Sequence, residues 1–209
     1  RILLNMLQCT DDKNADFRHK AVAHMGAIAS HSDKEISQLC IYSLCFASQS
    51  DPCRKLIVNS GVLRKIDADS CFDDENICFA FLTMFGNIAN DSYMRKSILD
   101  DLFVKRLASM AELDVHTLHL AVVKCLYYSS CELTNLPVLA KQNILEIVRK
   151  VWPMQWEAGP LLHEMMAFLA AFLYNTSVHW EAMNTFVLQG SAQMLTSAMH
   201  LLIHRSDPA

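Results

Sequence analysis

Leu44-Cys45-Phe46-Ala47-Ser48 decides the fold, because segments of the same character recur three times along the chain. They are Phe85-Gly86-Asn87-Ile88-Ala89, Leu126-Tyr127-Tyr128-Ser129-Ser130 and Leu173-Tyr174-Asn175-Thr176-Ser177, with starts 41 (85 − 44), 41 (126 − 85) and 47 (173 − 126) residues apart. Each begins with a bulky apolar residue and ends with a small one. A large apolar residue follows nine positions later in every case: Ile57, Ile98, Leu139 and Phe186. A period of about forty residues predicts an α-solenoid, whose units must stack to bury their apolar faces.

The composition is that of a folded domain with a large core. Of 209 residues, 52% are hydrophobic and 19% are charged, a length that suits one domain or two small ones. The net charge is −4, and the 18 Lys and Arg are scattered rather than clustered. We therefore expect no nucleic-acid partner, because such partners need a dense row of phosphate-neutralising cations. The most apolar run, Met165 to Tyr174, is too short to cross a bilayer. Because the sequence begins at Arg1, we also expect it to be a piece of a longer chain.

Hydrophobic periodicity predicts an all-α protein, since no segment shows sustained period-two alternation. The expected helices cover the following residues: 2–9, 15–30, 35–48, 52–58, 62–68, 74–90, 94–99, 102–111, 115–130, 136–141, 144–152, 160–175, 181–188 and 192–204. One helix of each unit is apolar almost all round. In the helix that ends at Asn90, the polar interruptions Thr83 and Asn87 are four residues apart and share one narrow face. Ala171 and Asn175 occupy the same two places in a later helix.

Several of these segments resemble the armadillo repeat, a unit of a short helix, a second helix and a long third helix. Asp51-Pro52-Cys53-Arg54-Lys55-Leu56-Ile57-Val58-Asn59-Ser60-Gly61 contains Arg-x-x-Ile-x-x-x-Gly, which resembles the first helix and its turn into the second. Tyr93 to Ile98 repeats the Arg and Ile, with Leu102 in place of the Gly. Phe186 to Gly190 restores the Gly, with Met183 in the Arg place. The segment 85–89 resembles the end of a third helix.

The resemblance covers residues 35 to 204 and implies a right-handed superhelix, with HEAT repeats as the alternative. It divides a single domain, 1–209, into four to five repeats at 35–50, 51–90, 92–131, 133–177 and 179–205, after an irregular part, 1–34. Met25-Gly26-Ala27-Ile28-Ala29 lies only 19 (44 − 25) residues before Leu44, too few for a whole unit. Either a unit lacks its first two helices here, or residues 15–30 form an elongated first helix of the next unit.

The family's third helices line a concave groove that binds extended peptides. Carried across by register, the expected groove residues are Tyr42, Phe46, Thr83, Asn87, Lys124, Tyr128, Ala171 and Asn175. A side-chain amide can hold a ligand main chain as donor and acceptor together, and tyrosines offer rigid contact area. The alternative is that Asn87 and Asn175 bond to neighbouring helix ends. Thr83 and Ala171 replace the Trp of nuclear-import adaptors, so we do not expect recognition of a nuclear localisation signal.

The sequence shows no catalytic signature. His116 and His119, or His200 and His204, have the spacing of two metal ligands but lack a third. There is no phosphate-binding loop, nucleophile elbow or His-Glu-x-x-His helix. The eight cysteines form no Cys-x-x-Cys pair and are expected to be reduced, which favours a cytoplasmic protein. They are Cys9, Cys40, Cys45, Cys53, Cys71, Cys78, Cys125 and Cys131.

We therefore expect a non-catalytic scaffold for protein–protein interaction, with no metal or cofactor, that displays a rigid groove to a peptide or a partner domain. The first alternative is a structural component embedded through its convex face and ends in a large cytoskeletal or axonemal assembly. The second is an enzyme with an unrecognised Cys/His site. Trp152 and Trp156 flank Pro153 in the longer spacing before the last segment. Trp156 is expected either to cover a helix end or to act as an exposed docking anchor.

Overall fold

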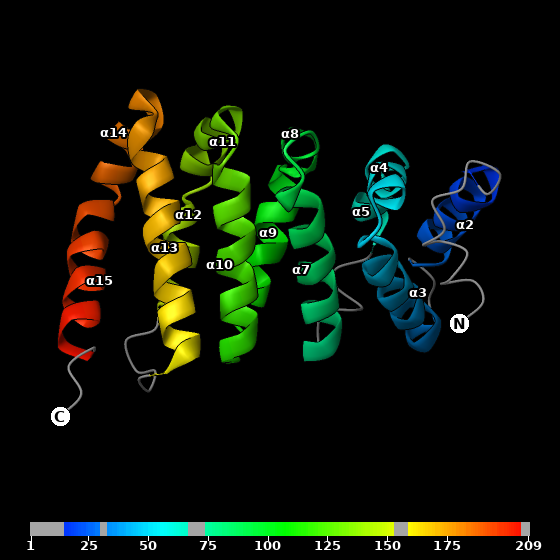
Figure 1. The fold of residues 1–209 in the computed structure, drawn as a ribbon, viewed down its shortest axis with the longest axis horizontal. Helices are drawn as coiled ribbons and strands as arrows, with labels where there is room; N and C mark the ends of the chain where they lie inside the picture. The colour runs from blue at the N-terminus through cyan, green and yellow to red at the C-terminus, as the bar shows by residue number, and fades with distance from the viewer. Residues whose placement is uncertain (1–14, 30–32, 67–73, 153–158, 206–209) are drawn as a thin grey trace. The chain divides into compact units, whose positions relative to one another are not determined.

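The computed structural model describes residues 15–29, 33–66, 74–152 and 159–205, and every regular element in these ranges is helical (Figure 1). The chain divides into two compact units, Arg1–Ile98 and Leu99–Ala209. The boundary between the units follows the helix that ends at Ile98.

The first unit contains six described helices. They are α2 (Ala15–Ile28), α3 (Lys34–Ala47), α4 (Asp51–Asn59), α5 (Val62–Lys65), α7 (Glu75–Asn90) and α8 (Arg95–Ile98). The long helices α3 and α7 are capped in the same way at their starts. Asp33 accepts hydrogen bonds from the N–H groups of Glu35 and Ile36, and Asp74 accepts them from Asn76 and Ile77. Each aspartate thereby satisfies two backbone donors that have no partner within the helix, and it places negative charge at the positive end of the dipole.

The second unit continues the same sequence of short and long helices. It contains α9 (Asp101–Met110), α10 (His116–Ser130), the 3₁₀ turn η2 (Leu133–Asn135), α11 (Leu136–Lys141), α12 (Ile144–Lys150), α13 (Pro160–Val178), α14 (Trp180–Leu188) and α15 (Ser191–Arg205). Pro160 stands at the start of α13, where its missing N–H costs no helical hydrogen bond.

The helices predicted from the sequence are confirmed over the described residues, and their ends agree within about one turn. The helix expected at 2–9 lies outside the described residues, as does the end of the one expected at 62–68. α13 continues to Val178, three residues beyond the expected end at Asn175. No sequence signal predicted the 3₁₀ turn η2, which Glu132 caps by accepting from the N–H of Thr134.

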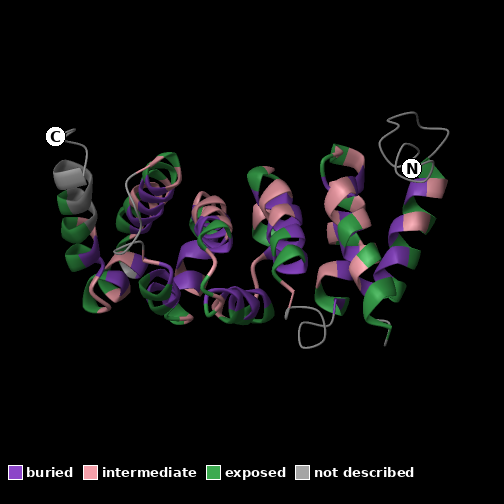
Figure 2. Ribbon diagram, turned by 90° about the horizontal axis from the view of Figure 1, so that it is seen from below, coloured by how far each residue is buried: buried purple, intermediate pink, exposed green. Residues whose placement is uncertain are grey.

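Each unit has its own apolar core between long helices (Figure 2). In the first unit α3 packs against α7, and Leu44, Phe81 and Phe85 are buried. In the second unit α10 packs against α13, where Leu126 and Phe172 are buried. The rings of Phe172 and Phe186 meet edge to face with centroids 6.3 Å apart, which is a favourable aromatic geometry. The first residue of every aligned segment is therefore a core residue, as the sequence pattern required.

A left-handed backbone turn recurs at one register position in both units. We count positions from the first residue of each aligned segment, so that Leu44, Phe85, Leu126 and Leu173 are at position 0. Position +17 is then Gly61, Leu102, Asn143 and Gly190 in chain order. Gly61, Asn143 and Gly190 have φ values of 66°, 52° and 96°, whereas Leu102 lies inside α9. A tight turn between two consecutive helices thus recurs wherever the residue at this position tolerates positive φ.

An arginine at position +10 bonds to the C-terminal end of the preceding long helix twice in the first unit. Arg54 donates to the carbonyl oxygens of Ser48 and Gln49, and Arg95 donates to those of Ala89 and Asn90. The accepting carbonyls are at positions +4 and +5 in both cases. Because carbonyls at a helix C-terminus lack partners within the helix, a cation that donates to them stabilises the end. The Arg noted in the sequence pattern therefore has a repeated structural role.

Candidate functional site

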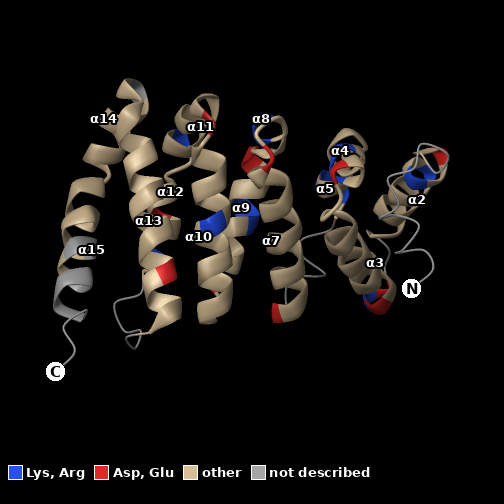
Figure 3. Ribbon diagram, viewed as in Figure 1, with Lys and Arg blue, Asp and Glu red and all other residues tan. Residues whose placement is uncertain are grey.

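The expected groove residues of the first unit lie on the neighbouring helices α3 and α7. Tyr42 is exposed, while Phe46, Thr83 and Asn87 are half-buried. Figure 3 shows that few charged residues lie along these long helices. The accessible chemistry of this face is therefore aromatic, hydroxyl and amide rather than ionic.

Asn87 bridges the two long helices α3 and α7 of the first unit. Its Nδ2 atom donates to Ser48 Oγ at 2.9 Å, and that hydroxyl in turn donates to the carbonyl oxygen of Cys45 at 2.5 Å. Ser48 is buried at the C-cap of α3. The amide is thus tied to the end of the preceding helix, which is the alternative that the sequence left open for Asn87.

Asn175 makes the same bridge in the second unit. Its Nδ2 atom lies 3.0 Å from Ser130 Oγ and 3.6 Å from Cys131 Sγ, and Ser130 Oγ donates to the carbonyl oxygen of Tyr127 at 2.7 Å. In both units the amide is at position +2, the serine at +4 of the preceding segment and the carbonyl at +1. The corresponding register positions of the second and third segments hold Ala89 and Tyr128, which cannot form an amide-to-hydroxyl pair.

These bridges leave part of each amide available, because a primary amide has two N–H donors and a carbonyl acceptor. Asn87 also lines an open polar cavity of about 350 Å³ together with Gln49, Asp51, Arg54, Asn90 and Asp91. Arg54 forms an ion pair with Asp51 and lies 3.9 Å from a carboxylate oxygen of Asp91. The cavity therefore combines three side-chain amides with two carboxylates around one guanidinium group.

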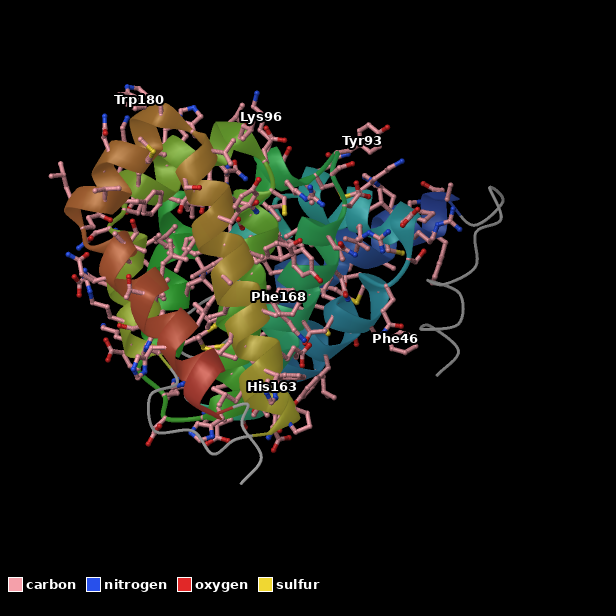
Figure 4. The ribbon with its side chains drawn as sticks, turned by 60° about the vertical axis from the view of Figure 1, so that its left-hand side comes forward. Phe46, Tyr93, Lys96, His163, Phe168 and Trp180 are labelled. Atoms are coloured by element: carbon pink, nitrogen blue, oxygen red, sulfur yellow. The ribbon has the colours of Figure 1, made fainter. Side chains whose placement is uncertain are left out.

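The second unit presents an aromatic cluster where the sequence placed Lys124 and Tyr128. Lys124 Nζ lies 2.6 Å from Glu164 Oε1 and 5.3 Å from the centre of the Phe168 ring. The rings of Tyr127 and Tyr128 meet that ring at a tilt and edge-on, with centroids 5.2 and 6.2 Å away. Figure 4 shows Phe168 on α13. The ammonium group of Lys124 is thus paired with the Glu164 carboxylate and lies over the Phe168 ring. It is not an unpaired cation that a ligand meets alone.

Sequence reasoning missed Glu164 and Phe168, although a signal for both was present. Phe168 is seven (175 − 168) and Glu164 eleven (175 − 164) residues before Asn175, so the three share one stripe of a helix. Register with the family's groove indicates only the two positions nearest the end of the helix, and it does not reach Glu164 and Phe168. Ala171, one of the expected groove residues, is half-buried and adds no polar group.

Four of the described cysteines have thiols whose pKa lies above the ordinary value. Burial raises the pKa of the Cys125, Cys45, Cys40 and Cys53 thiols, and it keeps them protonated near neutral pH. Thiolate rather than thiol is the nucleophile and the metal ligand. Cys9 and Cys71 lie outside the described residues. The raised thiol pKa values give no support to a Cys/His enzyme.

The two histidines of α10, His116 and His119, differ in burial. His116 is exposed, whereas His119 is buried and has its pKa lowered mainly by that burial, against backbone hydrogen bonds to Leu113 and Ala111. The described side chains contain no group of three or more His, Cys, Asp or Glu placed to hold a metal ion. The side chain of His204 and the residue Trp156 fall outside what the structure describes.

Comparison of the chain with models of protein families, with curated proteins and with solved structures finds no match. In the described part of the chain, no helix has both the length and the apolar character that a bilayer crossing requires.

Proposed function

We propose that this chain is a non-catalytic scaffold of armadillo-like repeats that binds an extended peptide along its third helices. The observation that carries the proposal is the polar cavity beside Asn87, an amide that the register independently assigns to the groove. Exposed Tyr42 on α3 supplies an aromatic contact along the same pair of helices. Rigid helical walls would hold the peptide with little ordering cost in the receptor.

The chemistry of the cavity favours a peptide that offers main-chain amides and a cationic or amide side chain. Gln49, Asn87 and Asn90 can each donate and accept, which suits the alternating donors and acceptors of an extended backbone. The cavity contains two carboxylates, those of Asp51 and Asp91, but only one guanidinium group, that of Arg54. A cationic side chain of the ligand would therefore balance the remaining negative charge. An acidic ligand residue would be repelled here.

The test compares binding of selected peptides by two tyrosine variants. Peptides are selected from a displayed library against the 1–209 chain, and their affinity is then measured by calorimetry. Tyr42→Ala should weaken binding by about tenfold or more if the tyrosine is a contact anchor. Tyr93→Ala is the matched control, because Tyr93 is an exposed tyrosine outside the expected groove (Figure 4). Equal affinity of both variants for every selected peptide would refute the groove.

A structural role in a larger assembly remains the second candidate, and exposed apolar side chains favour it. Trp180 and Leu188 of α14 are both largely exposed, and large exposed apolar groups mark interaction surfaces. This candidate predicts that the isolated chain self-associates or precipitates at concentrations where Trp180→Gln with Leu188→Gln stays monomeric. Sedimentation of the two proteins distinguishes them, and a monomeric wild-type chain would count against it.

A further inference from the structure

A lysine of this chain already occupies an aromatic face in the second unit. Lys124 of α10 places its ammonium nitrogen 5.3 Å from the centre of the Phe168 ring of α13 and 2.6 Å from Glu164 Oε1. Two more rings border the same place, because the rings of Tyr127 and Tyr128 lie 5.2 and 6.2 Å from that of Phe168. We call these three rings and the Glu164 carboxylate the cation cluster. Ring faces and carboxylates are the groups that attract an organic cation.

The lysine is held at the surface of the cluster and can leave it. The side chains of Lys124 and Glu164 are 33% and 46% exposed. An ion pair with this much water around it contributes little net free energy, because water screens the charges and both side chains lose rotamer freedom. The flexible four-carbon stem of the lysine lets its ammonium group move into water by side-chain rotation alone. Its departure frees the ring face and the carboxylate together.

The cation cluster lies where the register places ligand contacts. Lys124 and Tyr128 are expected groove residues, and Lys124 is the only charged residue among the eight. The lysine repels a cationic ligand, whereas the rings and the carboxylate beside it attract one. An internal cation that occupies a site lowers the apparent affinity of an external one by the fraction of time that it is bound.

We propose that the cation cluster binds an arginine side chain of a peptide ligand and that Lys124 is its internal competitor. A guanidinium group stacks flat on the Phe168 ring and pairs with both oxygens of Glu164, which a compact ammonium group cannot do. The arginine therefore replaces the lysine, whose ammonium group returns to water. This inference rests on the proposed function, because it adds a contact in the expected groove. Its site is in the second unit and does not involve the cavity beside Asn87.

The test is a titration of the isotope-labelled chain with Nα-acetyl-argininamide, which carries one guanidinium group and no other charge. Backbone amide signals at residues 124–128 and 164–168 should shift saturably at millimolar concentrations of the probe. Lys124→Met keeps an unbranched side chain but removes the competing cation, so it should bind the probe about threefold to tenfold more tightly than the wild type. Equal affinity of the two proteins would overturn the proposal.

A second variant separates competition from simple charge repulsion. Lys124→Arg keeps the positive charge but places a better stacking group on the ring, so it should bind the probe about threefold more weakly than the wild type. Charge repulsion alone predicts no difference between these two proteins. Circular dichroism checks that each variant folds, and Lys124→Arg decides the question by itself if Lys124→Met does not. An affinity of Lys124→Arg equal to that of the wild type would contradict internal competition.

Changes to the cluster and to the probe supply the controls. Glu164→Gln in the Lys124→Met background should weaken binding by about fivefold, because one carboxylate is lost. Nα-acetyl-citrullinamide, the neutral counterpart of the probe, should give no saturable shifts. Lys105→Met removes an exposed lysine of α9 and should leave the affinity of the wild type unchanged. Binding of the neutral probe with equal affinity, or an equal gain in Lys105→Met, would exclude the cation site.

The two proposals fail separately. Loss of the cation site, with peptide binding that still depends on Tyr42, would overturn only the contact in the second unit. Selected peptides that ignore Tyr42, together with an arginine probe that behaves as expected, would refute the groove of the first unit and leave the cation site in place.

Discussion

At the scale of single residues, Asn143 carries a backbone geometry that two glycines carry elsewhere. Its φ of 52° matches the left-handed turns at Gly61 and Gly190. The armadillo pattern has Gly at position +17, so it does not indicate Asn143. Asparagine tolerates this region better than other side chains because its short amide can hydrogen-bond locally. A search for Gly or Asn at that position would have found it.

His119 makes the stability of the second unit dependent on pH. Burial lowers its pKa in the folded state below that of the unfolded chain, where the ordinary value is about 6.5. The unfolded state therefore binds more protons below that value, and stability falls as pH decreases from about 6.5. Melting temperatures of wild type and His119→Gln are compared at high and low pH.

The glutamine variant should lose less stability on acidification than the wild type, because its side chain is neutral throughout. His163→Gln is the control, since His163 is exposed and its ring Nδ1 lies 2.9 Å from the carbonyl oxygen of Gly159, the N-cap of the same helix. An identical acid dependence in wild type and His119→Gln would show that His119 does not titrate on unfolding.

At the scale of helices, the two glycines inside α2 and α7 have opposite surroundings. A Cβ atom at Gly26 would lie 2.5 Å from Val62 Cγ2, where α2 packs against α5. A Cβ atom at Gly86 would meet nothing within 4 Å. Gly26 therefore permits a close helix approach, whereas Gly86 only weakens its helix.

Alanine substitution at these two glycines should change the free energy of unfolding in opposite directions. Gly26→Ala should destabilise the chain by about 1 to 3 kcal/mol through overpacking. Gly86→Ala should stabilise it by about 0.5 to 1 kcal/mol through helix propensity. Urea unfolding followed by circular dichroism measures both changes. Destabilisation by Gly86→Ala would mean that something occupies the space beside it.

At the scale of the whole molecule, the contacts are concentrated within two units. Leu126 is fully buried where α10 packs against α13 in the second unit. Leu126→Ala should cost about 2 to 5 kcal/mol, as expected for a leucine cavity. A protein whose contacts are mainly local can unfold one region at a time, while the rest of the chain stays folded. Hydrogen exchange should therefore quicken in α10 and α13 more than in α3 and α7.

A conservative change at the same site gives the control, since Leu126→Met nearly preserves volume and should cost less than about 1.5 kcal/mol. A cost below about half a kcal/mol for Leu126→Ala would contradict the register. Equal acceleration of exchange in both units would contradict local opening.

The sequence by itself determined the helices and the buried first residue of each aligned segment. These depend on local rules: Asp33 and Asp74 cap helices through their own following N–H groups, and apolar spacing selects the buried face. The tertiary structure alone decided that Asn87 and Asn175 bridge to Ser48 and Ser130. It also decided that Lys124 contacts the face of the Phe168 ring and that the side chain of Tyr174 is exposed. A side chain's partner is set by which helix lies beside it in space, and residues about forty positions apart carry no local signal of that neighbour.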